Sequence, residues 1–294
     1  MLRTRFAPSP TGHLHVGNAY SALLCQQWAE RHQAELLLRI EDIDFNRCRP
    51  AFAADLIDDL GWLGIQWQGD IHYQSRYLSA YTEVLEMLRD EGLVYPCFCT
   101  RRDLRHEIEH IGLAPHAEDM PEIYPGTCRH LTIEERKQRI KDGFPYAWRL
   151  DVQAAMRRVG EISWQDGDGC HHPVHPDLND AVIGRKDIGI SYHLAVVVDD
   201  AVQGITHIIR GEDLRSSTGL HRLLQALLGF PMPVYLHHAL LCNEAGERLA
   251  KRNGAPSLRE LRTSGASADT LRRLLLHNGD AAPDPWKGLA AVDG

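Results

Sequence analysis

The sequence lacks several features that would assign it to a membrane, exported or strongly nucleic-acid-binding class. No stretch approaches the roughly 20 apolar residues of a membrane-spanning helix, and the opening MLRTRFAPSP contains no apolar export segment. An excess of basic residues is also missing, because the net charge is −8, which argues against binding nucleic acid through bulk electrostatics. We expect a cytoplasmic protein that has no membrane partner.

Cysteine is scarce, and internal repeats and low-complexity segments are absent. The seven cysteines are an odd number in a chain without an export signal, so we expect reduced thiols that either bind a metal or are buried. With 294 residues, of which 44% are hydrophobic and 24% charged, the chain can form two domains or one domain with a large insertion.

The hydrophobic pattern predicts an α/β protein with a parallel sheet. Strands and helices alternate over the first 95 residues, the pattern then breaks, and strands return near residue 187. In this second part we expect strands in ISYHLAVVVDD and GITHIIRG, followed by a helix in STGLHRLLQALLG. The predicted organisation is a core of residues 1–95 and 187–240, an insertion of residues 96–186, and a loop with helices over residues 241–294.

Polar side chains fall at the ends of these predicted strands. Arg5 lies on the first strand, Glu41 ends the second, Tyr192 opens the third and Arg210 ends the fourth. The ligand groups of an open α/β sheet gather at its strand ends, and two arginines, a carboxylate and a phenol suit a zwitterion with additional negative charge. The alternative is that these charged residues form ion pairs that stabilise the fold.

Two further segments carry groups that suit a nucleotide. Prolines and glycines exclude regular structure after the first strand, and the helix that starts near Gly17 offers backbone N–H groups to a phosphate beside His13 and His15. The segment GERLAKRNGA holds Arg248 and Lys251, and such a loop could close over a triphosphate and neutralise the departing pyrophosphate. The alternatives are a helix-entry loop that happens to contain histidine and a solvated turn.

Five stretches together resemble the catalytic core of the class I glutamyl-tRNA synthetases. They are PSPTGHLHVGN, RIED, YHLAVVVDD, IIRGEDL and RLAKR, and the resemblance runs from residue 3 to about residue 262. HVGN stands for the HIGH motif of that family, with Asn18 in place of the second histidine, and RLAKR stands for the KMSKS motif. The resemblance implies the Rossmann-type parallel sheet of class I aminoacyl-tRNA synthetases, split by a zinc-bearing insertion and followed by a short helical segment.

The resemblance also implies roles for particular residues. ATP, accompanied by Mg²⁺, would react with L-glutamate to glutamyl-adenylate without tRNA, and the catalytic residues would be His15, Asn18 and Lys251. The residues implied for ATP are His13, His15, Gly17, Asn18, Arg248 and Lys251. The residues implied for glutamate are Arg5, Phe6, Ala7, Pro8, Ser9, Glu41, Tyr192 and Arg210.

The position of GERLAKRNGA, called the cationic loop from here on, indicates which RNA accepts the glutamate. The chain ends at Gly294, 43 residues after Lys251, which is too short for the helical anticodon-binding domain of a full glutamyl-tRNA synthetase. A glutamyl core without that domain resembles the glutamyl-queuosine tRNA(Asp) synthetases, which attach glutamate to the queuosine base of tRNA(Asp). We therefore expect queuosine-containing tRNA(Asp) as the RNA partner of a monomeric enzyme. The alternatives are a truncated glutamyl-tRNA synthetase that charges a 3′ end, a non-catalytic tRNA-binding paralogue, and a nucleotidyltransferase for another small acid.

The resemblance further implies a metal site in the insertion. Cys97-Phe-Cys99 is followed by Tyr124-Pro-Gly-Thr-Cys128, and the family holds a structural zinc with a Cys-x-Cys pair and a Tyr-x3-Cys pair. Zinc prefers four tetrahedral ligands, and a phenol is an unusual one, so His130 is the substitute for the fourth position. The alternative is that the thiols are separate and Tyr124 only packs.

Overall fold

The computed structural model describes residues 1–100, 103, 124–175, 178–242 and 256–278. The strands are β1 (Arg3–Phe6), β2 (Glu35–Ile40), β3 (His72–Tyr73), β4 (Val94–Cys97), β5 (Ala147–Leu150), β6 (Ser163–Asp166), β7 (His171–Pro173), β8 (Val182–Gly184), β9 (His207–Gly211) and β10 (Val234–His238). The helices are α1 (Val16–Arg31), α2 (Pro50–Leu63), α3 (Leu78–Asp90), α5 (Ile133–Lys141), α6 (Val152–Val159), α7 (Tyr192–Val202), α8 (Thr218–Leu227), α9 (Leu258–Thr263) and α10 (Ala268–Asn278). Short 3-10 turns are η1 (Gln74–Arg76), η2 (Thr127–His130) and η3 (Glu212–Ser217).

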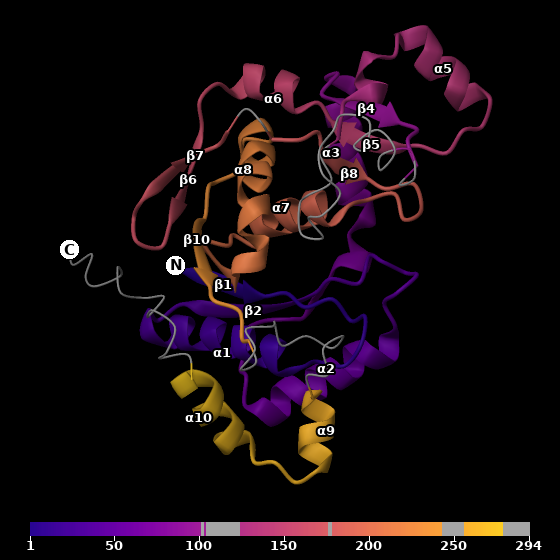
Figure 1. Ribbon diagram of the computed structural model, residues 1–294. Coiled ribbons are helices and arrows are strands. Elements are labelled where there is room, and N and C mark those ends of the chain that lie inside the picture. The colour runs from indigo at the N-terminus through magenta and orange to yellow at the C-terminus, as the bar shows by residue number, and fades with distance from the viewer. Residues whose placement is uncertain (101–102, 104–123, 176–177, 243–255, 279–294) are drawn as a thin grey trace.

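The central feature is a parallel sheet made from two parts that are far apart in the sequence (Figure 1). β2 pairs in parallel with β1 and β3, β10 pairs in parallel with β9 and β6, and β7 adds an antiparallel edge. The two parts meet where β1 lies beside β9, and there the amide of Thr206 donates to the carbonyl of Arg3 at 2.9 Å. In the sheet, β2 lies on one side of β1, and β9 and then β10 lie on the other side. Open α/β sheets bind their ligands at such a point, where the strand order reverses.

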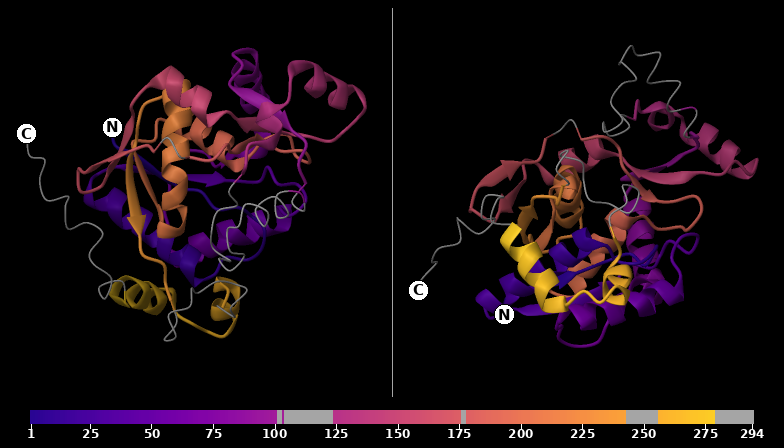
Figure 2. Two further views of the ribbon diagram at one scale, coloured as in Figure 1. Left: turned by 45° about the horizontal axis from the view of Figure 1, so that its top comes forward. Right: turned by 60° about the horizontal axis from the view of Figure 1, so that its bottom comes forward.

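Helices cover both faces of this sheet, as the views in Figures 1 and 2 show. On one face α1 packs against β1, β2 and β9, and α10 packs against α1 and α2. On the other face α7 packs against α8, which also contacts α6 and β6. Within the described part of the chain, none of these helices is both long and apolar enough to cross a membrane.

The predicted α/β class is confirmed, but one predicted strand is wrong. ISYHLAVVVDD forms α7, which Ser191 caps by accepting a hydrogen bond from the amide of Leu194. Residues 194–200 of this helix are all buried, because it packs against both α3 and α8. Tyr192 therefore opens a helix and not a strand. The sequence prediction also omitted β10, the central strand of the second part of the sheet.

The segment predicted as an insertion contributes to two different sheets. β4, β5 and β8 form an antiparallel sheet beside the core, and α5 projects from it at the upper right of Figure 1. β6, in contrast, pairs in parallel with β10 of the central sheet. The division into domains at residues 95, 186 and 240 stays a prediction.

Candidate active site

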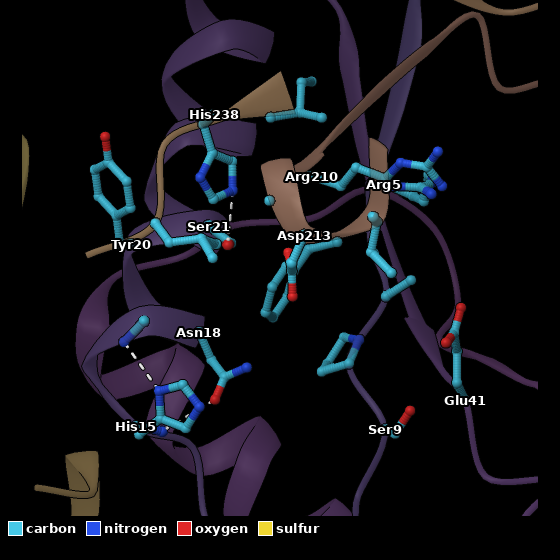
Figure 3. A pocket seen from close by; sticks show the side chains of 18 of the residues that line it. Arg5, Ser9, His15, Asn18, Tyr20, Ser21, Glu41, Arg210, Asp213 and His238 are labelled. Carbon is cyan, nitrogen blue, oxygen red and sulfur yellow. Dashed lines mark hydrogen bonds between the residues drawn. The ribbon is translucent and has the colours of Figure 1, made fainter. Parts of the chain in front are cut away.

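A cavity of about 480 Å³ lies at the point where the two parts of the central sheet meet. Its wall contains side chains from β1, the N-terminus of α1, the end of β2, the first turn of α7, β9 and the segment after β10 (Figure 3). The predicted residues that line it are Arg5, Phe6, Ala7, Pro8, Ser9, His15, Gly17, Asn18, Glu41, Tyr192 and Arg210. The structure thus brings every residue predicted for glutamate and part of the set predicted for ATP into one cavity.

His13 is placed differently from the other residues predicted for ATP. It is not among the side chains that line the cavity. Its Nδ1 lies 3.3 Å from a carboxylate oxygen of Asp55, and its ring meets Phe52 edge-on with the centroids 5.1 Å apart. Its contacts are therefore with α2, and its role toward ATP stays a prediction.

The cationic loop with Arg248 and Lys251 lies outside the described residues. The described residues on both sides of it are at the site. Leu241, before the loop, lines the cavity, and Ser257, after it, forms an isolated β-bridge with His15. The described residues before and after the loop therefore lie at the cavity and at the N-terminus of α1.

His15 and Asn18 cap the N-terminus of α1 through reciprocal hydrogen bonds (Figure 3). His15 Nδ1 accepts from the amide of Gly17 at 3.0 Å, and Asn18 Oδ1 accepts from the amide of His15 at 3.1 Å. A neutral imidazole that accepts at Nδ1 carries its proton on Nε2, and the Asn18 amide group keeps its N–H donors. This helix end therefore presents side-chain donors together with its backbone N–H groups, an arrangement that favours phosphate.

A buried ionic network holds Arg5 from beneath the cavity. Its Nε donates to Asp200 Oδ1 at 3.0 Å, and the same oxygen accepts from Arg39 Nη2 at 2.6 Å. These three side chains are at most 5% exposed. Burial opposes the ionisation of Asp200, but the two arginines outweigh it and lower the pKa of this carboxyl. The charge of Arg5 is therefore countered within the protein.

Glu41 is a buried carboxyl at the cavity wall. It follows β2 directly, and its amide donates to the carbonyl of Pro8 at 3.0 Å. Burial raises the pKa of Glu41 to about 7, against the opposing effect of Arg39 and Arg5. A carboxyl group with such a perturbed pKa in a cavity is typical of a functional site, and a substrate ammonium group would favour its ionised form.

Part of the cavity wall was missed by sequence reasoning. Tyr20 and Ser21 line it, and both are one helical turn from Gly17, a spacing that could have identified them. Ser21 Oγ lies 2.9 Å from Nε2 of His238, which ends the unpredicted strand β10. Asp213, in η3, also lines the cavity.

A second group of side chains meets between β4 and η2. The sulfur atoms of Cys97, Cys99 and Cys128 all lie within 4.8 Å of one another. Tyr124 Oη accepts from the amide of Cys128 at 2.8 Å and lies 3.6 Å from the sulfur of Cys97. His130, the predicted substitute, is exposed and does not belong to this group. The three cysteines could bind a metal ion.

The strand order, the capped helix at its switch point and the two arginines of the cavity fit the catalytic core of a class I aminoacyl-tRNA synthetase. Residues 1–281 match the family model described as tRNA synthetases class I (E and Q), catalytic domain. A glutamyl-Q tRNA(Asp) synthetase of Rhodobacter capsulatus is 44% identical over 92% of this chain and 99% of that relative. A relative of the same name from Nitratidesulfovibrio vulgaris is 40% identical over 97% of this chain and 88% of its own length.

Proteins named as glutamate–tRNA ligases or synthetases are similar over a smaller share of their own length. The glutamate–tRNA ligase of Aquifex aeolicus is 39% identical over 96% of this chain and 58% of that relative. The solved glutamate–tRNA synthetase of Elizabethkingia anophelis matches with a TM-score of 0.72 and 30% identity, over 86% of this chain and 53% of that one. The chain belongs to the glutamyl-Q tRNA(Asp) synthetase family, within the class I synthetases, and is an enzyme of the ligase type.

Proposed function

We propose that this enzyme activates L-glutamate with ATP and transfers it to the queuosine base in the anticodon of tRNA(Asp). The observation that carries the proposal is one cavity that joins Arg5, Glu41 and Arg210 to the capped N-terminus of α1. The queuosine acceptor is supported by the relatives that bear this activity in their names and align over most of their length. We also propose that the enzyme acts as a monomer, since the described residues of one chain already bring the groups for glutamate and for phosphate into this cavity.

In the first half-reaction an oxygen of the α-carboxylate of glutamate attacks the α-phosphorus of ATP. The bond to pyrophosphate breaks, and glutamyl-adenylate forms. Arg5 and Arg210 bind carboxylate groups, Glu41 binds the ammonium group, and His15 and Asn18 bind phosphate together with α1, while Mg²⁺ accompanies the nucleotide. This chemistry needs positioning and charge stabilisation and no protein nucleophile.

A cation near the helix end would stabilise the departing pyrophosphate, and the two described arginines that line the cavity, Arg5 and Arg210, belong to β1 and β9 instead. We assign it to Lys251, with Arg248 as a second phosphate contact. The described flanks of the loop, Leu241 and Ser257, support this assignment because both are at the cavity or at His15. In the second half-reaction a hydroxyl of the modified base attacks the activated carbonyl carbon and releases AMP.

We also propose that Cys97, Cys99, Cys128 and Tyr124 hold a structural zinc ion. With Zn–S distances of about 2.3 Å, tetrahedral ligand atoms stand roughly 3.8 Å apart. The sulfur atoms of Cys99 and Cys128 are 3.4 Å apart, and Tyr124 Oη is 3.6 Å from Cys97, so small shifts give the required separation. Zinc in such a closed set of ligands stabilises folding and takes no part in the reaction.

Transfer of labelled glutamate tests the proposed function. The purified protein is incubated with ATP and labelled glutamate, and the acceptor is tRNA(Asp) with queuosine, tRNA(Asp) without it, or unmodified tRNA(Glu). We expect label on queuosine-containing tRNA(Asp) only, and an unchanged yield after removal of the 3′-terminal adenosine. The similarity to glutamate–tRNA ligases makes 3′-end charging the second candidate. Label that disappears with the 3′ adenosine and persists on tRNA(Glu) would establish that candidate.

A further inference from the structure

The two arginines of the cavity have opposite surroundings. Arg5 donates to Asp200, whereas the hydrogen-bond partners of Arg210 among the described residues are all neutral. Its guanidinium donates to Thr218 Oγ1 at 2.7 Å and lies 3.1 Å from His221 Nδ1 and 3.3 Å from His237 Nε2. None of the ion pairs between described residues includes Arg210, although its side chain is only 5% exposed. Among the described residues this buried cation thus has no ion-pair partner, since Asp200, whose charge also acts on it, is bonded to Arg5 and Arg39 instead.

Because a guanidinium group can only donate, Arg210 fixes the tautomers of its neighbours. His221 must accept at Nδ1, so its proton is on Nε2, which lies 3.0 Å from His193 Nδ1 and donates to it. His237 must accept at Nε2, which is also 3.2 Å from the hydroxyl of Thr218. A protonated ring would instead face Arg210 with a donor and a like charge. Burial and Arg210 lower the pKa of His193 to about 4 and that of His237 to about 3, so both rings are neutral at pH 7.

We propose that His221 is a positioning residue that orients Arg210 toward glutamate through a neutral acceptor and so leaves its charge to the substrate carboxylate. The inference rests on the proposed function. A carboxylate in place of His221 would orient Arg210 equally well, but it would counter the charge, as Asp200 does for Arg5. Because no described carboxylate pairs with Arg210, its charge is available to the substrate, which favours a carboxylate over the amide of glutamine.

Three substitutions at one position separate orientation from charge. His221→Asn keeps a neutral acceptor where Nδ1 stands, His221→Leu removes the acceptor, and His221→Asp keeps an acceptor but adds a negative charge. Glutamate-dependent ATP–pyrophosphate exchange gives KM and kcat for each variant. Loss of a hydrogen bond to a charged group costs enough to raise the KM for glutamate about tenfold or more. We expect such an increase for the Leu variant because the hydrogen bond is lost, and for the Asp variant because the added charge counters that of Arg210. In both variants we expect a smaller change in kcat and a lower preference for glutamate over glutamine.

The asparagine variant keeps a neutral acceptor for Arg210, so its KM is expected within about threefold of wild type. His207→Asn replaces another partly buried histidine, one that packs on Trp28 at the start of β9 and does not line the cavity, and should leave KM unchanged. An unchanged KM in the Leu variant would refute the orienting role. Equal KM values for the Asn and Asp variants would refute the requirement for a neutral acceptor.

The tautomers are measured independently of activity by NMR of protein labelled with ¹⁵N in histidine. At pH 7 we expect His221 to be protonated at Nε2 and unprotonated at Nδ1, and a proton on Nδ1 would overturn the proposal. If the wild type gives this spectrum and binds glutamate in calorimetry but shows no exchange, the proposed function fails. The glutamate affinities of the variants then decide the role of His221. If the wild type exchanges normally but His221 has the other tautomer, only the positioning proposal fails.

Discussion

Asp200→Asn tests whether the buried ionic network sets the position of Arg5. Asp200 Oδ1 accepts from Arg5 at 3.0 Å and from Arg39 at 2.6 Å, and all three side chains are almost completely buried. Asparagine keeps the size of the side chain and one acceptor oxygen, but it removes the charge and has an NH2 group in place of the second oxygen. Any loss therefore reports on the electrostatic part of the network and not on packing.

The structure sets the size of the expected loss. Removal of one partner from a buried ion pair costs about 3–5 kcal/mol, because an uncompensated charge is left in the interior. Asp199 Oδ2 lies 3.7 Å from Arg39 Nε and still counters part of the remaining charge, so we expect the lower end of that range. A loss of about 3 kcal/mol is a large share of a typical stability of 5–15 kcal/mol, yet it leaves the protein folded. At about 2–4 °C per kcal/mol, the melting temperature should fall by roughly 6–12 °C.

Urea unfolding at pH 7 measures this difference, and Asp90→Asn is the matched control. Asp90 pairs with Arg89 at 3.2 Å on the surface, where its side chain is 72% exposed, so its loss should cost about 1 kcal/mol or less. The pKa of Asp200 is lowered in the folded state, so its contribution is present above the unfolded-state pKa and is lost as the pH falls through the folded-state value. The difference in the free energy of unfolding between wild type and Asp200→Asn should therefore become smaller at acidic pH. A loss at pH 7 no larger than that of the control would refute the reasoning.

Three further predictions concern substrate binding and the metal. Burial raises the pKa of Glu41 to about 7, so the KM for glutamate should rise as the pH falls below 7, because a neutral Glu41 cannot pair with the ammonium group. Glu41→Gln should abolish this pH dependence, and a wild-type KM that stays constant from pH 6 to 8 would contradict the prediction. Arg210→Ala should cost about 2–5 kcal/mol in kcat/KM for exchange, whereas activity within twofold of wild type would place Arg210 outside the site. Elemental analysis should find about one zinc per chain, lost in Cys97→Ser and Cys128→Ser but kept when the exposed Cys170 is changed to Ser; zinc retained in all three would contradict the proposed site.

Much of the cavity could be predicted from the sequence, because its residues carry local signals. Arg5 and Glu41 belong to predicted strands whose carboxyl ends meet at one edge of a parallel sheet, and that edge is where the structure places them. Asn18 and its neighbours lie where a proline- and glycine-containing loop enters a helix. The partners that hold the arginines carry no such signal. Asp200 is 195 positions from Arg5, and His221 meets Arg210 only because α8 packs against β6 and against η3, the turn that directly follows β9.

The segment of α7 was predicted as a strand, and this error shows why a wrong secondary structure also leads to a missed residue, here Asp200. A helix that is buried on all sides has no polar stripe, so the run of valines in YHLAVVVDD lacks the helical period and favours a strand. In a strand, Tyr192 and Asp200 would be about 26 Å apart, since each residue adds about 3.3 Å. In a helix the same eight steps span about 12 Å and complete slightly more than two turns, which returns both side chains to one face. Only the helix allows Tyr192 to line the cavity while Asp200 holds Arg5 beneath it.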